Sequence, residues 1–60
     1  MQESEIQDYA RQLFEARGDR ALVEAAQHAS SFEAKGNAEE AKTWRHIEAA
    51  IRLMRGPNVS

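Results

Sequence analysis

The chain has 60 residues, a formal net charge of −2 and no cysteine. This length allows one small domain, and without cysteine neither a disulfide nor a thiolate zinc site can stabilise it. The opening MQESEIQDYAR has no cationic start followed by an apolar run, so we expect no signal peptide. Apolar runs stay well below the roughly 18 residues of a membrane span. We therefore expect a cytoplasmic protein that does not contact membranes.

The first predicted helix covers residues 5–17. Ser4 is a suitable N-cap residue, and Gln7 stands at the position that completes a capping box. Gly18 follows the last helical residue, where a positive φ is favoured. Between these signals the apolar residues recur at the spacing of one helix face, namely at Ile6, Tyr9, Ala10, Leu13 and Phe14.

The second predicted helix covers residues 20–35, with Asp19 as its N-cap and Gly36 at its end. Alanine dominates the apolar side of this helix. It is the best helix former, and its small side chain lets a neighbouring backbone come close. We therefore expect this helix to form a floor under larger side chains. Its main apolar stripe is Leu22, Ala25, Ala26, Ala29 and Phe32.

The third predicted helix covers residues 38–55. Asn37 is its expected N-cap, Glu40 completes a capping box, and Gly56 with Pro57 ends it. Its large apolar residues and one alanine span an arc of about 120°; they are Trp44, Ile47, Ala50, Ile51 and Met54. Leu53 falls outside this arc. It indicates either a second contact surface, which we favour, or ordinary exposed apolar area.

Together these segments predict an all-α fold over residues 1–60, a three-helix bundle with tight Gly-Asp and Gly-Asn corners and about 45 helical residues. The sequences FEARGD and FEAKGN lie 18 residues apart, so one continuous helix would bring them into phase. We prefer breaks at both glycines, because glycine inside a helix costs about 1 kcal/mol.

Several of these residues form a pattern that is similar to a known family. The pattern is Ala10, Leu13, Gly18, Ala21, Ala25-Ala26, Ala29, Gly36-Asn37 and Trp44-Arg45-x-Ile47-x-x-Ala50-Ile51-x-x-Met54. It resembles an uncharacterised family of short helical bacterial proteins and covers about residues 6–54. The resemblance implies a small cytoplasmic bacterial protein and carries over no catalytic or binding residue. A likeness of Phe32, Gly36 and Ala41 to one tetratricopeptide hairpin is set aside, because solenoids need about three repeats.

Catalytic and metal-binding chemistry has few candidate residues. His28 and His46 are the only histidines, and with Glu24 or Glu48 they could hold a metal ion, although no H-E-x-x-H pattern brings them together. The serines near His28 lack a glycine-rich loop that would supply oxyanion donors. We therefore expect no enzymatic activity and no cofactor.

A basic stripe of Lys42, Arg45 and Arg52 lies opposite the apolar arc of the third predicted helix. It supports an alternative function, a small regulator that contacts the phosphate backbone of nucleic acid. The usual helix-turn-helix reading fails, because the preceding helix is too long and no Asn-, Gln- and Arg-rich recognition surface is present. We favour a solvated basic face and consider nucleic-acid binding the less favoured function.

The apolar residues are few for a chain that must order about 50 residues, because a 60-residue domain buries only about 60% of its unfolded surface. A partner surface would compensate, and a second copy is the simplest partner. The leading hypothesis is a small non-enzymatic interaction protein that forms a homodimer through its third helix; an unknown protein partner is the other option. The candidate interface is Tyr9, Leu13, Phe14, Trp44, Ile47, Ile51, Leu53 and Met54.

Overall fold

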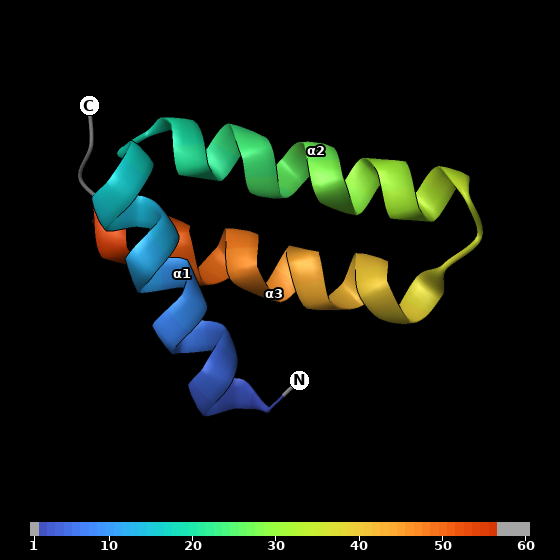
Figure 1. The fold of residues 1–60 in the computed structure, drawn as a ribbon, viewed down its shortest axis with the longest axis horizontal. Helices are drawn as coiled ribbons and strands as arrows, with labels where there is room; N and C mark the ends of the chain where they lie inside the picture. Colours follow the sequence, from blue (N-terminus) through green and yellow to red (C-terminus); the bar gives the residue numbers. More distant parts are fainter. Residues whose placement is uncertain (1, 57–60) are drawn as a thin grey trace.

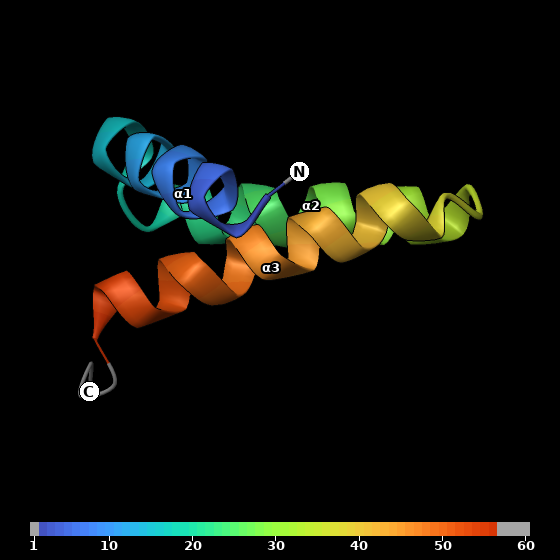
Figure 2. The same ribbon diagram turned by 90° about the horizontal axis from the view of Figure 1, so that it is seen from below.

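Three α-helices follow one another in the computed structural model, which describes residues 2–56. Helix α1 runs over Glu3–Arg17, α2 over Arg20–Ala34 and α3 over Ala38–Arg55, with 15, 15 and 18 residues. Helices α2 and α3 form an antiparallel hairpin, and α1 crosses one face of it (Figures 1 and 2). The all-α fold with two tight corners is confirmed, and the predicted helix bounds agree within two residues.

The start of α1 differs from the prediction. The helix begins at Glu3, so Ser4 lies within its first turn. Gln2 occupies the N-cap position. The backbone N–H of Gln2 donates to Oε1 of Glu5 at 3.1 Å. Ser4 as N-cap is therefore wrong, because a Gln2–Glu5 interaction satisfies the helix end two residues earlier.

The corner between α1 and α2 uses the positive φ that the sequence predicted for Gly18. Its φ is 63°, and its N–H donates to the carbonyl of Phe14 at 2.7 Å. Asp19 occupies the N-cap position of α2, but its side chain makes no capping hydrogen bond. Its Oδ1 instead pairs with Nε of Arg55 at 3.1 Å, which joins the start of α2 to the end of α3.

The corner between α2 and α3 combines Gly36, whose φ is 78°, with Asn37 as the N-cap of α3. Oδ1 of Asn37 accepts a hydrogen bond from the N–H of Glu40 at 3.3 Å. The N–H of Asn37 donates to the carbonyl of Phe32 at 2.9 Å. In the predicted capping box the Glu40 side chain would accept from the N–H of Asn37. In the structure the carbonyl of Phe32 accepts from this N–H instead. Helix α3 ends at Gly56 with a φ of 93°; Pro57 lies outside the described residues.

The core is built mainly from alanine. Two large side chains in the described part of the chain are fully buried, Ile47 and Ile51, both from α3. Around them lie small buried residues from all three helices, so the helix backbones approach closely and α2 forms the expected floor. The central cluster consists of Ile6, Ala10, Ala21, Ala25, Ile47, Ala50 and Ile51, with Ala29 and Ala41 buried beside it.

Candidate interaction surface

The structure divides the eight predicted interface residues into two groups. Ile47 and Ile51 have exposed fractions of 1% and 0% within the single chain, so they belong to its own core. Their assignment to an intermolecular interface is corrected: α1 and α2 already cover this part of the apolar arc. Leu13 and Phe14 are half-buried and pack against the same core.

Trp44 is also half-buried, whereas Tyr9, Leu53 and Met54 are exposed. Leu53 is 76% exposed, the largest value among the exposed large apolar side chains, and the adjacent Met54 is 36% exposed. Leu53 lies outside the apolar arc of α3, as its helical position predicted, and no other element of the described chain covers it. Burying such a side chain on association would contribute about 1.5–3 kcal/mol.

Two hollows flank the crossing of α1 over α3, and both share Ile6 and His46. The first, called the N-side groove, lies toward the start of α3 and has a volume of about 440 Å³; its other lining residues are Ala38, Glu39, Lys42 and Thr43. The second, called the C-side groove, lies toward the end of α3 and has a volume of about 230 Å³; its other lining residues are Glu3, Gln7, Ala49, Ala50 and Leu53.

The two grooves differ in their lining: the N-side groove is lined mainly by polar side chains, whereas the C-side groove is mainly apolar. Ile6 is only 5% exposed, and Ala50, which lines the C-side groove, is 4% exposed. Charged side chains occur in each groove: Lys42 and Glu39 in the N-side groove, and Glu3 in the C-side groove. In the C-side groove, an apolar floor with a charged residue at its edge resembles a protein contact surface, in which an apolar centre is surrounded by a polar rim.

Three rings form an aromatic cluster where the helices meet. The imidazole of His28 stacks on the indole of Trp44 with ring centroids 4.3 Å apart and planes 23° apart. Tyr9 from α1 approaches the same indole edge-on, at 5.8 Å and 79°. Edge-to-face and offset-stacked pairs are the favoured aromatic geometries. Tyr9 and Trp44 therefore connect α1 to the hairpin, and the part that His28 plays here has no signal in the sequence.

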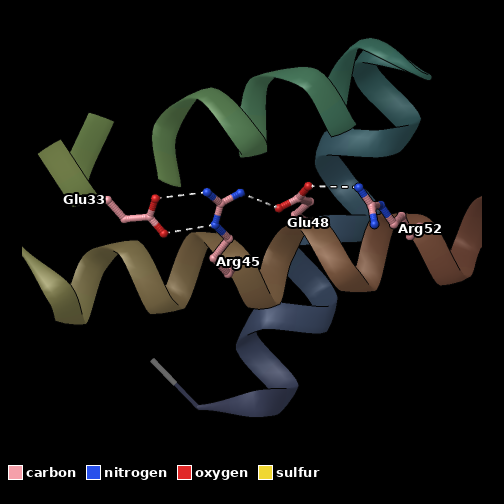
Figure 3. A network of polar contacts seen from close by, with 4 residues as sticks. All are labelled: Glu33, Arg45, Glu48 and Arg52. Atoms are coloured by element: carbon pink, nitrogen blue, oxygen red, sulfur yellow. Dashed lines mark hydrogen bonds and ion pairs between the residues drawn. The ribbon is translucent and has the colours of Figure 1, made fainter. Parts of the chain in front are cut away.

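An ionic network spans the face of the hairpin that is opposite α1 (Figure 3). The guanidinium of Arg45 donates from Nη2 and Nε to the two carboxylate oxygens of Glu33 on α2, at 3.0 and 3.2 Å. Its Nη1 donates to Oε1 of Glu48 at 3.0 Å, and Oε2 of Glu48 accepts from Arg52 at 3.3 Å. The contact of Arg45 with both oxygens of Glu33 is the strong, bidentate form of an arginine–carboxylate pair. It links α2 to α3.

The contact between Arg45 and Glu33 shifts the pKa values of both side chains. The hydrogen bond from Arg45 lowers the pKa of the Glu33 carboxyl below its usual value, and the charge of Arg45 acts in the same direction. The hydrogen bonds to Glu33 and Glu48 raise the pKa of the Arg45 guanidinium. Both side chains remain about half exposed, so each pair contributes little to stability.

The network also changes the reading of the basic stripe. Arg45 and Arg52 both contact carboxylates, whereas Lys42 lines the N-side groove and makes no ion pair with another of residues 2–56. The stripe is therefore partly neutralised by the protein itself. The structure thus offers a phosphate backbone less positive charge than the sequence suggested.

The two histidines lie in different surroundings. His28 on α2 stacks on Trp44, and His46 on α3 lies between the two grooves. Within residues 2–56 no group of three histidine or acidic side chains has the spacing to hold a metal ion. The same part of the chain has no helix that is both long and apolar enough to cross a membrane.

Comparison of the chain with protein-family models, with curated proteins and with solved structures finds no match. The function must therefore be inferred from the surface that the residues themselves form.

Proposed function

We propose that the protein is a small, non-enzymatic helical interaction module that self-associates through α3, with the cytoplasm as its place of action. The exposure of Leu53 carries this proposal: a leucine that is 76% exposed stands at the wall of an apolar groove. Scattered single apolar residues are normal on protein surfaces. Leu53 differs from them because it stands at a mainly apolar groove, beside the exposed Ala49.

The small core supports the same proposal. Most of the buried residues are alanines, and a domain of this length gains limited stability from its own interior. Covering Leu53 and the groove beside it would add apolar burial that the single chain lacks. A second copy of the chain is always present as a possible partner, and closed two-fold dimers are the commonest oligomers of soluble proteins.

The test of this proposal is the substitution Leu53→Lys, with Val23→Lys as its matched control. Val23 is also an exposed apolar residue, at 53%, but it lies on α2 and lines neither groove. Sedimentation equilibrium across the micromolar range measures the dimer dissociation constant of each protein. We expect the wild type and Val23→Lys to dimerise and Leu53→Lys to dimerise at least about tenfold more weakly, because a change of 1.4 kcal/mol is a tenfold change.

Circular dichroism must show the same helix content in all three proteins, so that weaker association reflects the contact and not unfolding. A wild type that sediments as a monomer throughout this range contradicts self-association. If Leu53→Lys dimerises as tightly as the wild type, Leu53 is not part of the dimer contact.

A further inference from the structure

We propose that the stack of His28 on Trp44 is a pH-sensitive contact, which stabilises the three-helix fold more strongly in mildly acidic solution than at neutral pH. The inference does not depend on self-association. Histidine is the side chain whose charge ordinarily changes between about pH 5 and 8. A proton on His28 turns a stack of two neutral rings into a contact between a planar cation and the face of the indole, which is a cation–π interaction.

The geometry of the stack fits such an interaction. The ring centroids are 4.3 Å apart and the planes differ by 23°, so the imidazole lies over the face of the indole. A cation is attracted there by the negative charge of the aromatic face, within about 6 Å of the ring centre. His28 belongs to α2 and Trp44 to α3, the two antiparallel helices of the hairpin (Figure 1), so a stronger stack strengthens the contact between these helices.

The two rings differ in their exposure. His28 is exposed, so its ring exchanges protons directly with water. Trp44 is half-buried, and Tyr9 of α1 approaches it edge-on at 5.8 Å. The indole is therefore held by packing and by a contact with a third helix. A change of charge on His28 acts on a ring that is already oriented.

The charged residues near the three rings favour a positive charge on His28. Side chains three or four residues apart are neighbours on a helix, and at this spacing from the rings all charged residues are glutamates. They are Glu5 near Tyr9 on α1, Glu24 near His28 on α2, and Glu40 and Glu48 near Trp44 on α3. Nearby carboxylates favour the charged form of an imidazole.

Two of these glutamates are already partly neutralised. Arg17 of α1 donates to Glu24 at 3.2 Å, and Glu48 accepts from Arg45 and Arg52. Lys35, two turns after His28, has its ammonium 5.6 Å from the centre of the Phe32 ring. All four glutamates reach solvent, which screens their charges. The stack itself therefore carries the inference, and the carboxylates add to it.

The test is thermal unfolding of the wild type and three variants at about pH 5.5 and 7.5, on either side of the ordinary titration of histidine. His28→Gln removes both the ring and its charge, whereas His28→Phe keeps a ring that cannot be charged. His46→Gln is the matched control, because His46 is the only other histidine and lies at the two grooves. All proteins are measured at one concentration, and circular dichroism must show equal helix content.

We expect the Tm of the wild type to exceed that of His28→Gln by about 2–4 °C more at the acidic pH than at the neutral pH. His28→Phe should match the wild type at the neutral pH and lose this additional stability in acid. His46→Gln should keep the pH response of the wild type.

The emission of Trp44 gives a second measurement, because this residue is the only tryptophan. A charge that forms against the face of the indole changes its emission. Titration of the folded wild type should therefore show a transition in the range where histidine titrates. The transition should disappear in both His28 variants and remain in His46→Gln.

Two results would overturn the inference. An equal Tm difference between the wild type and His28→Gln at both pH values would mean that the charge of the ring contributes nothing. A pH response that persists in His28→Phe would assign it to another group. Neither result bears on self-association: a monomeric wild type that shows the response removes the proposed function alone, and a dimer without the response removes this inference alone.

Discussion

Replacing Gly36 with alanine should perturb the corner between α2 and α3 through the backbone alone. Gly36 has a φ of 78°, and a Cβ placed on it would meet no atom within 4 Å. The cost therefore comes from conformation and not from a clash. A left-handed backbone costs a residue with a Cβ about 1–2 kcal/mol, and restricting the unfolded chain returns about 0.4–1 kcal/mol. We expect Gly36→Ala to lower the free energy of unfolding by about 1 kcal/mol.

Thermal unfolding followed by circular dichroism measures this change. For a domain of this size, 1 kcal/mol corresponds to a fall in Tm of about 4–8 °C. Gly36→Asn is the matched control, because asparagine tolerates positive φ better than other residues with side chains, and its Tm should lie between the other two. A Gly36→Ala protein with a Tm above that of the wild type would refute the reasoning, since it would mean that the helix continues through the corner.

Three further predictions concern the aromatic cluster, the ionic network and the basic side chains. Trp44→Ala should lower the free energy of unfolding in urea by about 2–3 kcal/mol, less than the 3–5 kcal/mol of a fully buried tryptophan, because Trp44 is half-buried. Glu33→Gln should remove stability that is present at neutral pH and absent in acid. Because Arg45 lowers the pKa of Glu33 in the folded protein, this contribution is complete above the ordinary pKa of 4.5 and disappears as the pH falls through the lower folded value; the Tm difference from the wild type, measured against pH, follows it. Binding to random duplex DNA, measured by fluorescence anisotropy, should be weak and fall more than tenfold between about 50 and 200 mM salt, since about three phosphate contacts, from Lys42, Arg45 and Arg52, are available per chain.

Each of these predictions has a result that contradicts it. A Trp44→Ala protein as stable as the wild type would show that the aromatic cluster does not hold α1 to the hairpin. A Tm difference that persists at low pH would show that the effect of Glu33 does not come from its charge. Sub-micromolar, sequence-selective DNA binding at physiological salt would make a nucleic-acid regulator the leading function.

The helices were predictable because their end signals are local. Gly18 and Gly36 adopt the positive φ that their position after a helix indicated, and Asn37 caps α3 with its side chain as expected. The exception is the start of α1. Ser4 matched the usual capping pattern, but the helix begins one residue before it, at Glu3. The local pattern does not decide between Gln2 and Ser4 as the N-cap residue.

The contacts between helices were less predictable. Helical spacing shows that Ile47 and Ile51 must be covered, but it does not say whether the chain or a partner covers them; the structure shows that the chain does. The same limit applies to Arg45. Its position on α3 is clear from the sequence, but its pairing with Glu33 depends on how α2 lies beside α3. The stack of His28 on Trp44 likewise requires the antiparallel arrangement of the hairpin.

The alanine-rich seam between the helices has a consequence for how this protein tolerates mutation. Ala21, Ala25 and Ala29 have no exposed surface, so each already lies against its neighbours. In most cores the damaging changes are losses of volume, which leave cavities. At these three alanines the damaging changes are gains, because an added methylene would have to displace the neighbouring atoms, and overpacking costs about 1–3 kcal/mol. Random substitution should therefore be poorly tolerated at these small side chains, where most mutations enlarge the residue.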